Sequence, residues 1–109
     1  MAEVLGAFEQ AVLLAIVRLG PDAYGRAILK EAEDRLEREI AAGAVHATLE
    51  RLQRKGLIAS RLGAGTALRG GRARRFYRLQ PAGVTALNDA RAAIEDLWRG
   101  LTWPLKGTL

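Results

Sequence analysis

The sequence predicts a small, mainly α-helical domain that carries one short β-hairpin. Apolar residues recur at alternating three- and four-residue spacing in four separate segments, which is the pattern of helices with a buried face. Two short runs in the second half of the chain are rich in strand-forming residues instead, and Gly or Pro marks most boundaries between segments. With 109 residues, half of them hydrophobic, the chain is long enough for one domain with a modest core.

The first helix is expected to run from Val4 to Leu19. Its apolar positions at helical spacing are Leu5, Phe8, Val12, Ile16 and Leu19. Nearly every residue in the range 11–17 is also apolar, so this helix should be buried on more than one side. The Gly-Pro-Asp sequence that follows cannot continue the helix, and its Asp22 is expected to cap the next one.

The second helix is expected from Ala23 to Glu39, with an apolar stripe on one face and charged residues on the other. Gly25 lies inside this segment, where glycine costs ~1 kcal/mol relative to alanine. We therefore expect another part of the backbone to pack closely against Gly25.

A third helix is expected from Ala42 to Lys55, followed by Gly56 as a left-handed cap. Its buried face should contain Val45, Leu49 and Leu52. Small residues at the start of this helix and basic residues at its end lie on the opposite face. Two helices joined by so short a turn match the helix-turn-helix arrangement, in which the second helix enters the major groove of DNA.

A β-hairpin is expected next, with strands from Leu57 to Leu62 and from Arg74 to Leu79. The loop between them, residues 63–73, contains four glycines and suits a mobile wing better than a tight turn. From residue 51 to residue 78 the chain has nine Arg or Lys residues and no Asp or Glu, whereas the remainder has eight basic and twelve acidic residues. This uneven charge predicts a surface for nucleic acid and favours it over a merely solvated basic face.

The last helix is expected to begin at Pro81, where a missing N–H costs little. The apolar residues that repeat along it are Leu87, Ala90, Ile94, Leu97 and Leu101. Their spacing is that of a helix-pair seam, and so small a chain has little core left to cover them, so we expect a second copy to do so. The expected division is a winged helix-turn-helix DNA-binding domain over residues 1–80 and a C-terminal dimerisation helix with its tail over residues 81–109.

The residue inventory argues against an enzyme. The chain has one serine, one histidine and no cysteine, so it cannot assemble a catalytic triad or a Cys-His pair. For the same reason we expect no metal site and no cofactor. The longest apolar run has seven residues, far short of the ~20 that a membrane span needs, and the start of the chain lacks the basic region of a signal peptide. A cytoplasmic protein without membrane contact is therefore expected.

Three blocks of the sequence, in order, resemble the PadR family of bacterial transcriptional regulators. They are AYGRAI from Ala23 to Ile28, GAVHATLERLQRKGLI from Gly43 to Ile58, and GGRARRFYRLQPAG from Gly70 to Gly83. The similarity covers essentially the whole chain and looks like the short subfamily, whose C-terminal part is a single dimerisation helix. The resemblance implies a winged helix-turn-helix homodimer on double-stranded DNA with a dyad-symmetric operator. The third helices would enter successive major grooves, and the wings would contact flanking phosphates or the minor groove.

Most members of this family repress transcription, and some release DNA when a small aromatic compound binds at the dimer interface. Both properties are implied here as expectations. Three positions depart from the family pattern. His46 stands where a tyrosine usually reaches DNA, Ala41 where a serine usually caps the third helix, and Gln80 where threonine is usual. The departure at His46 affects the expected phosphate contact and its pH dependence.

The residues expected to contact DNA lie in the third helix and in the wing. They are Gly43, His46, Ala47, Thr48, Arg51, Arg54, Lys55, Arg69, Gly71, Arg72 and Arg74. Ala47 and Thr48, at the exposed start of the helix, are suited to thymine methyl groups. Arg51 fits either guanine or phosphate, and His46 is either a DNA contact or a plain helix-surface residue; the sequence leaves both alternatives open.

A second set of residues is expected at the interface between two copies. These are Leu5, Phe8, Leu87, Ala90, Ile94, Leu97, Trp98 and Leu101. Trp98 and Trp103 would either line a pocket for an aromatic ligand between subunits or serve as interface packing.

Two other functions compete with regulation of duplex DNA. The first is a protein-interaction module on the same fold with weak or no DNA binding, which only the unusual His46 supports. The second is a binder of RNA or single strands, disfavoured because the basic loop lacks aromatic residues for stacking.

Overall fold

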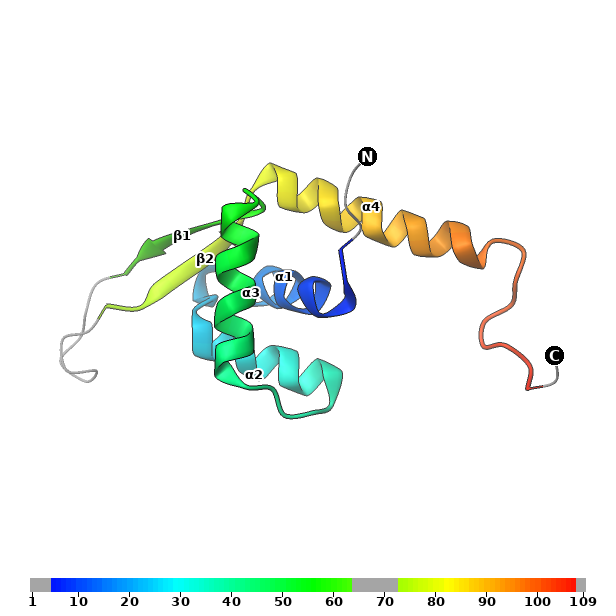
Figure 1. The fold of residues 1–109 in the computed structure, drawn as a ribbon, viewed down its shortest axis with the longest axis horizontal. Helices are drawn as coiled ribbons and strands as arrows, with labels where there is room; N and C mark the ends of the chain where they lie inside the picture. Colours follow the sequence, from blue (N-terminus) through cyan, green and yellow to red (C-terminus); the bar gives the residue numbers. More distant parts are fainter. Residues whose placement is uncertain (1–4, 64–72, 108–109) are drawn as a thin grey trace.

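The structure, a computed structural model, describes residues 5–63 and 73–107 and confirms the mainly helical fold with one antiparallel hairpin. The elements in chain order are α1 (Ala7–Leu19), a 3-10 turn (Gly20–Asp22), α2 (Gly25–Leu36), α3 (Ala42–Arg54), β1 (Ile58–Leu62), β2 (Arg75–Leu79) and α4 (Pro81–Trp98). The hairpin and α4 leave the helical body in opposite directions (Figure 1), so the molecule is elongated, with dimensions of 59 × 30 × 21 Å. In the described part of the chain, no helix is both long enough and apolar enough to span a membrane.

The core lies between α1, α2 and α3 and extends to the start of the hairpin. Its largest fully buried side chains are Val12, Leu13, Ile28, Leu49, Leu52 and Ile58. Val12, Ile28, Leu49 and Leu52 come from the apolar stripes predicted for the helices, Leu13 from the apolar run of the first helix, and Ile58 from strand β1. The expectation that α1 is buried on more than one side is wrong within a single chain, because Leu14 is 44% exposed and Val17 is 53% exposed.

The start of α1 is fixed by a side chain from its own first turn. Helix α1 begins at Ala7, three residues later than expected, with Gly6 in an extended conformation before it. The Gly6 N–H donates to Glu9 Oε1 at 3.2 Å, which satisfies one of the free donors at the helix end. This contact also holds the Glu9 carboxylate near the N-terminus of α1.

The start of α2 corrects three expectations. Ala23 and Tyr24 are not helical, because Tyr24 forms an isolated bridge with Phe76 of β2 and the Tyr77 N–H donates to the Ala23 carbonyl at 2.8 Å. Asp22 lies in the 3-10 turn and does not cap α2. A Cβ on Gly25 would meet nothing within 4 Å, so no backbone packs against it. Gly25 is the first residue of α2 rather than an interior one.

The turn from α2 to α3 begins earlier than the sequence predicts. Helix α2 ends at Leu36 because Glu37 adopts a left-handed conformation, with φ of 53°. The Ile40 N–H then donates to Glu33 Oε2 at 2.9 Å and holds the turn against α2. Helix α3 begins at Ala42 after Ala41, which offers no side-chain cap. This agrees with the missing serine at that position.

The hairpin follows directly from the end of α3. Gly56 has a φ of 77°, the left-handed conformation expected of it. Strand β1 pairs with β2 from Ile58 opposite Leu79 to Leu62 opposite Arg75, so each strand begins one residue later than predicted. Most of the expected wing, residues 64–72, lies outside the described residues.

Helix α4 is covered by the rest of the chain only near its start. Pro81 is its first residue, and both Gly83 and Ala90 are buried. Beyond Ala90 the helix has no buried residue, and Ile94 is 49% exposed and Leu97 74% exposed. The second half of α4 therefore extends away from the body (Figure 1) with its apolar side chains uncovered.

Candidate nucleic-acid interface

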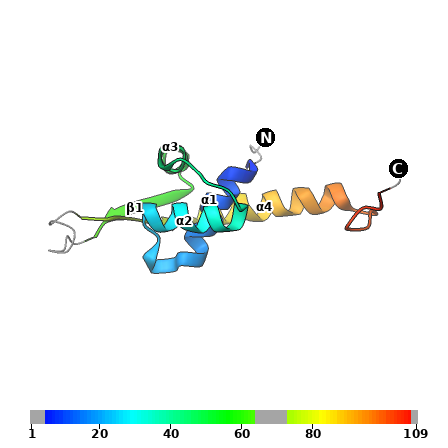
Figure 2. The same ribbon diagram turned by 90° about the horizontal axis from the view of Figure 1, so that it is seen from below.

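Helix α3 has one face in the core and the other in solvent. Figure 2, in which α3 is seen close to end-on, shows it projecting from one side of the molecule. Its buried side chains are Val45, Thr48, Leu49 and Leu52. The predicted DNA contacts that lie on its exposed face are Gly43, His46, Ala47, Arg51, Arg54 and Lys55. The structure thus brings most of the helical group together on one accessible surface.

Thr48 is the exception, and its predicted exposure is wrong. Thr48 is only 3% exposed, because it falls between Val45 and Leu52 on the stripe of α3 that faces the core. Its Oγ1 accepts a hydrogen bond from Arg51 Nη2 at 3.4 Å. Thr48 therefore orients Arg51 and does not offer its methyl group to a base.

Arg51 and Lys55 are paired with an acidic residue from α1. Glu9 Oε2 lies 3.3 Å from Arg51 Nε and 3.4 Å from Lys55 Nζ. Partial burial raises the pKa of Glu9, but the Gly6 N–H, the Arg51 hydrogen bond and the charge of Lys55 outweigh it and hold that pKa below its ordinary value. The stretch from 51 to 78 has no acidic residue in sequence, yet the fold places a carboxylate against it.

His46 and Glu50 form a second pair on the exposed face of α3. His46 Nε2 lies 3.1 Å from Glu50 Oε1, one helical turn away, and both side chains are more than 60% exposed. Neither side chain packs in the hydrophobic core.

The described base of the wing is a stack of aromatic and basic side chains. The Arg74 guanidinium lies 4.0 Å from the Tyr24 ring centre, and Arg61 lies 5.0 Å from that of Phe76. Tyr24 and Phe76 themselves meet edge to face at 5.9 Å. Arg74, a predicted DNA contact, thus has its position set by Tyr24, the residue that directly precedes α2. The other predicted wing contacts, Arg69, Gly71 and Arg72, lie outside the described residues.

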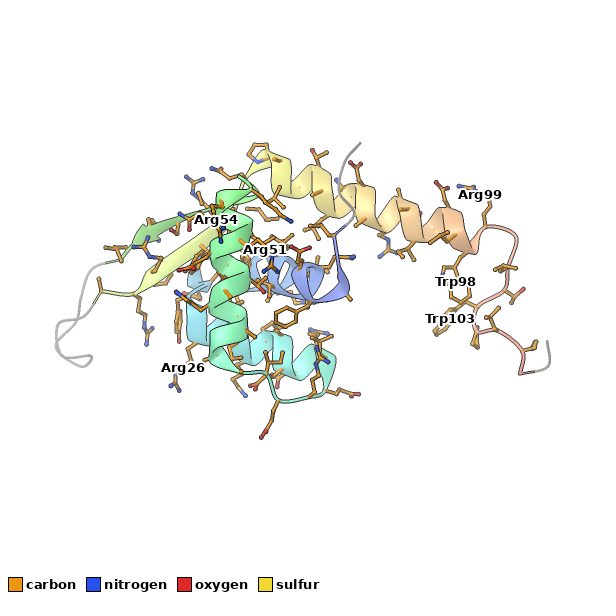
Figure 3. The ribbon with its side chains drawn as sticks, in the orientation of Figure 1. Arg26, Arg51, Arg54, Trp98, Arg99 and Trp103 are labelled. Atoms are coloured by element: carbon orange, nitrogen blue, oxygen red, sulfur yellow. The ribbon has the colours of Figure 1, made fainter. Side chains whose placement is uncertain are left out.

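An open groove of about 500 Å³ separates α2 from α3 on the same side as His46. Arg26 and Lys30, one turn apart on α2, line it together with His46. Figure 3 shows Arg26 pointing outward from α2, while Arg51 and Arg54 lie along α3. Arg26 and Lys30 were not among the residues predicted to contact DNA, although this groove makes them candidate phosphate contacts. Their spacing of four residues on the polar face of α2 was the available signal.

A second, apolar groove of about 680 Å³ lies between α1 and α4. Its apolar lining includes Leu14, Val17, Val84, Leu87 and Ile94. Leu87 and Ile94 were predicted at a dimer interface, whereas Leu14, Val17 and Val84 were not. The run of apolar residues in α1 carried the signal, because it has more apolar positions than a single buried stripe needs.

The remaining predicted interface residues divide into covered and uncovered groups. Leu5, at 6% exposure, and Ala90, at 4%, are already buried in the core of one chain. Both side chains pack within the core of one chain, and their place at a dimer interface stays a prediction. Phe8 is half-buried against the same cluster, whereas Leu101 is 59% exposed.

The two tryptophans lie at the far end of α4. Trp98 is the last residue of the helix and is half-buried, whereas Trp103 in the tail is 78% exposed. Figure 3 shows both on the same side of this end of the molecule. Neither tryptophan lines either of the two grooves described above.

Residues 13–89 match the model of the family described as the transcriptional regulator PadR-like family. The chain belongs to this family. The match runs from the middle of α1 to the middle of α4 and so includes the whole helix-turn-helix and the hairpin.

The PadR-like chain is 42% identical over 60 residues to the transcriptional regulator Rv3488 of Mycobacterium tuberculosis. That alignment covers 55% of this chain and 52% of the relative, so the matched region spans about half the relative's length. A crystal structure of a PadR family transcriptional regulator from Eggerthella lenta is 29% identical, with a TM-score of 0.64 and coverage of 82% of this chain and 75% of the other. A transcriptional regulator from Clostridium thermocellum is 22% identical, with a TM-score of 0.68 and coverage of 84% and 85%, and shows the shared fold.

Proposed function

We propose that this PadR-like regulator binds a specific duplex DNA sequence as a homodimer and represses transcription. The observation that carries the proposal is the exposed, largely basic face of α3, which projects from the molecule next to the hairpin. A face of this shape and charge fits the major groove, which admits one α-helix.

The exposed side chains of α3 would make two kinds of contact with DNA, to bases and to phosphates. Near its start, Gly43 allows close approach, His46 reaches outward, and Ala47 can contact a thymine methyl. Toward its end, Arg54 and Lys55 would contact phosphates, which position the helix without reading sequence. Arg51 lies between the two groups and would face either a guanine or a phosphate.

The other basic groups would hold flanking phosphates. Arg26 and Lys30 stand across the groove from His46, and Arg74 stands at the base of the wing against Tyr24. Arg69 and Arg72 would extend the contact through the wing. Contacts on both sides of an inserted helix fix its angle in the groove and make binding depend strongly on salt.

A second copy of the chain is proposed to cover the apolar groove between α1 and α4. Leu14, Val17 and Ile94 line one groove and are exposed in a single chain, so a twofold axis would bring the same surface of each copy together. In this proposal residues 1–80 carry the DNA-binding elements, and residues 81–109 dimerise together with Leu14 and Val17 of α1. A twofold dimer would present two α3 helices to a dyad-symmetric operator.

Release of DNA by a small aromatic ligand is a further part of the proposal. Trp98 and Trp103 offer flat apolar faces at the end of α4, where a second copy would turn an open surface into a pocket. The ligand would act by changing the angle between two α4 helices and therefore the spacing of the α3 helices.

The direct test is titration of duplex DNA that carries a dyad-symmetric element from the gene's own promoter, at two salt concentrations. We expect binding that weakens steeply with salt and exceeds that to a scrambled duplex. Arg54→Ala should weaken binding to both duplexes alike and reduce the salt slope by ~0.9. Arg99→Ala, which removes an exposed arginine paired with Asp96 at the end of α4, is the matched control and should leave the slope unchanged. Salt-insensitive binding, or none below micromolar concentrations, would favour the protein-interaction module instead.

A further inference from the structure

We infer that Glu9 is a positioning residue that sets the specificity of the proposed DNA-binding face. Its carboxylate holds Arg51 and Lys55, so that these two cations attract phosphate less and Arg51 keeps one orientation toward the groove. The inference rests on the proposed function, because it concerns how that face distinguishes one duplex from another.

The geometry fixes Glu9 first and the two cations through it. The Glu9 side chain is only 13% exposed, and its Oε1 accepts from the Gly6 N–H at 3.2 Å. Its Oε2 faces Arg51 Nε at 3.3 Å and Lys55 Nζ at 3.4 Å. Arg51 is 44% exposed and Lys55 30% exposed, so the anion lies beneath the surface and the cations lie above it.

Arg51 is oriented from two directions. Its Nε points to Glu9 on α1, and its Nη2 donates to Thr48 Oγ1 at 3.4 Å on α3. Thr48 is itself buried and Glu9 is held by the Gly6 N–H, so both partners of the guanidinium are fixed in place. A guanidinium held in this way has less freedom to follow the DNA backbone, and its remaining N–H groups keep a fixed direction suited to a base edge.

Glu9 also changes the charge that the end of α3 presents. Two cations and one carboxylate carry a net charge of +1 instead of +2. Non-specific affinity depends on how many phosphates a protein neutralises, because each neutralised phosphate releases counterions. A phosphate that pairs with Arg51 or Lys55 must compete with Glu9, whereas a base contact can use the orientation that Glu9 maintains. Glu9 therefore lowers binding to arbitrary DNA more than binding to the operator.

The experiment compares Glu9→Gln with Glu31→Gln in the full chain. Glu31 is a matched control because its carboxylate also joins two helices, lying 3.8 Å from Arg18 of α1 and 3.1 Å from Arg35 of α2, but those contacts do not involve α3. Both substitutions remove one negative charge. Fluorescence anisotropy would give the dissociation constants for operator and scrambled duplexes across a series of salt concentrations.

Glu9→Gln should tighten binding to the scrambled duplex and steepen the salt slope by up to ~0.9 for each released cation. The ratio of operator to scrambled affinity should fall roughly two- to fivefold, the range that partly exposed ion pairs contribute. Glu31→Gln should change neither quantity beyond the small general effect of net charge. Equal slopes and equal affinity ratios for the two variants would overturn the inference.

Two further variants separate positioning from damage to the fold. Glu9→Asp keeps the charge but withdraws the carboxylate by one methylene, so it should shift the salt slope in the same direction even if Glu9→Gln is poorly folded. In an Arg51→Gln background, Glu9→Gln should no longer reduce discrimination between operator and scrambled DNA, because the oriented guanidinium is gone; an undiminished effect would overturn the inference.

If the unaltered protein fails to distinguish operator from scrambled DNA, the proposed function fails as well. If it discriminates and Glu9→Gln keeps the full ratio, the role of Glu9 alone is refuted.

Discussion

The junction between the hairpin and α4 leaves no room for a side chain at Gly83. A Cβ built on Gly83 would lie 2.2 Å from the Leu57 carbonyl oxygen and 2.8 Å from Leu79 Cδ2. The Leu57 carbonyl also accepts the Gln80 N–H at 2.9 Å, so it ties the start of α4 to the residue that precedes β1. Gly83→Ala should therefore disturb the point from which α4 leaves the body.

The size of the effect follows from two opposing terms. The Cβ–oxygen distance of 2.2 Å is about 1.1 Å shorter than ordinary C–H···O contacts, so helix and carbonyl must separate by about that much. Such overpacking costs ~1–3 kcal/mol. Replacing glycine by alanine where the backbone allows it contributes ~0.4–1 kcal/mol in the opposite direction. We expect Gly83→Ala to reduce the free energy of unfolding by about 1–2 kcal/mol.

Urea denaturation followed by circular dichroism measures this quantity, at one protein concentration because a dimer's stability depends on it. Gly43→Ala is the matched control, since Gly43 lies in the first turn of α3 and a Cβ there meets nothing within 4 Å. It should be neutral or stabilising. A Gly83→Ala protein as stable as the Gly43→Ala protein would refute the close-packing argument and the rigid exit of α4 that depends on it.

Three other predictions concern assembly, pH and ligand. The double variant Ile94→Asp, Leu97→Asp should be monomeric by light scattering and should no longer bind the operator. The control Ala92→Asp, on the other side of α4, should remain dimeric. If the double variant is still a dimer, the interface lies elsewhere. Because the pKa of Glu9 is lowered in the folded protein, its carboxylate contributes stability above its unfolded pKa of ~4.3, and that contribution is lost as the pH falls through the folded value. Wild type should thus exceed Glu9→Gln in unfolding free energy at neutral pH and approach it in acid; a constant difference would contradict this assignment. Aromatic compounds should quench tryptophan fluorescence saturably and lose this effect in Trp98→Phe, and quenching that never saturates would indicate no binding site.

The sequence was most informative where the periodicity of apolar residues was long and regular. The helices that became α1, α3 and α4 were placed to within a few residues, and Gly56 and Pro81 marked two of their boundaries correctly. The ends of α2 were less predictable. Its start depends on pairing between Tyr24 and Phe76, residues far apart in the chain, and its end depends on Glu37 in a conformation usually taken by glycine.

Candidate site residues divide in the same way. Gly43, His46 and Ala47 could be placed on an exposed face from helical spacing alone, because that spacing repeats along the chain. Thr48 could not, since its exposure depends on how α3 is rotated against α1 and α2, and that rotation is set by packing. Arg26 on α2 was missed because its proximity to His46 arises only when the two helices pack.

By itself the sequence determined that the chain is mainly helical with one hairpin, that its positive charge is concentrated from residue 51 to 78, and that α4 carries more apolar residues than one small core needs. These are properties of composition and local spacing. Only the tertiary structure decided which of the described basic side chains have an acidic partner nearby. It brings Glu9 across 42 residues of sequence to Arg51, and it leaves Leu14 and Val17 beside the uncovered face of α4. The reason is physical: hydrogen bonds, ion pairs and burial act over a few ångströms in space, and distance along the chain does not reveal which residues the fold brings that close.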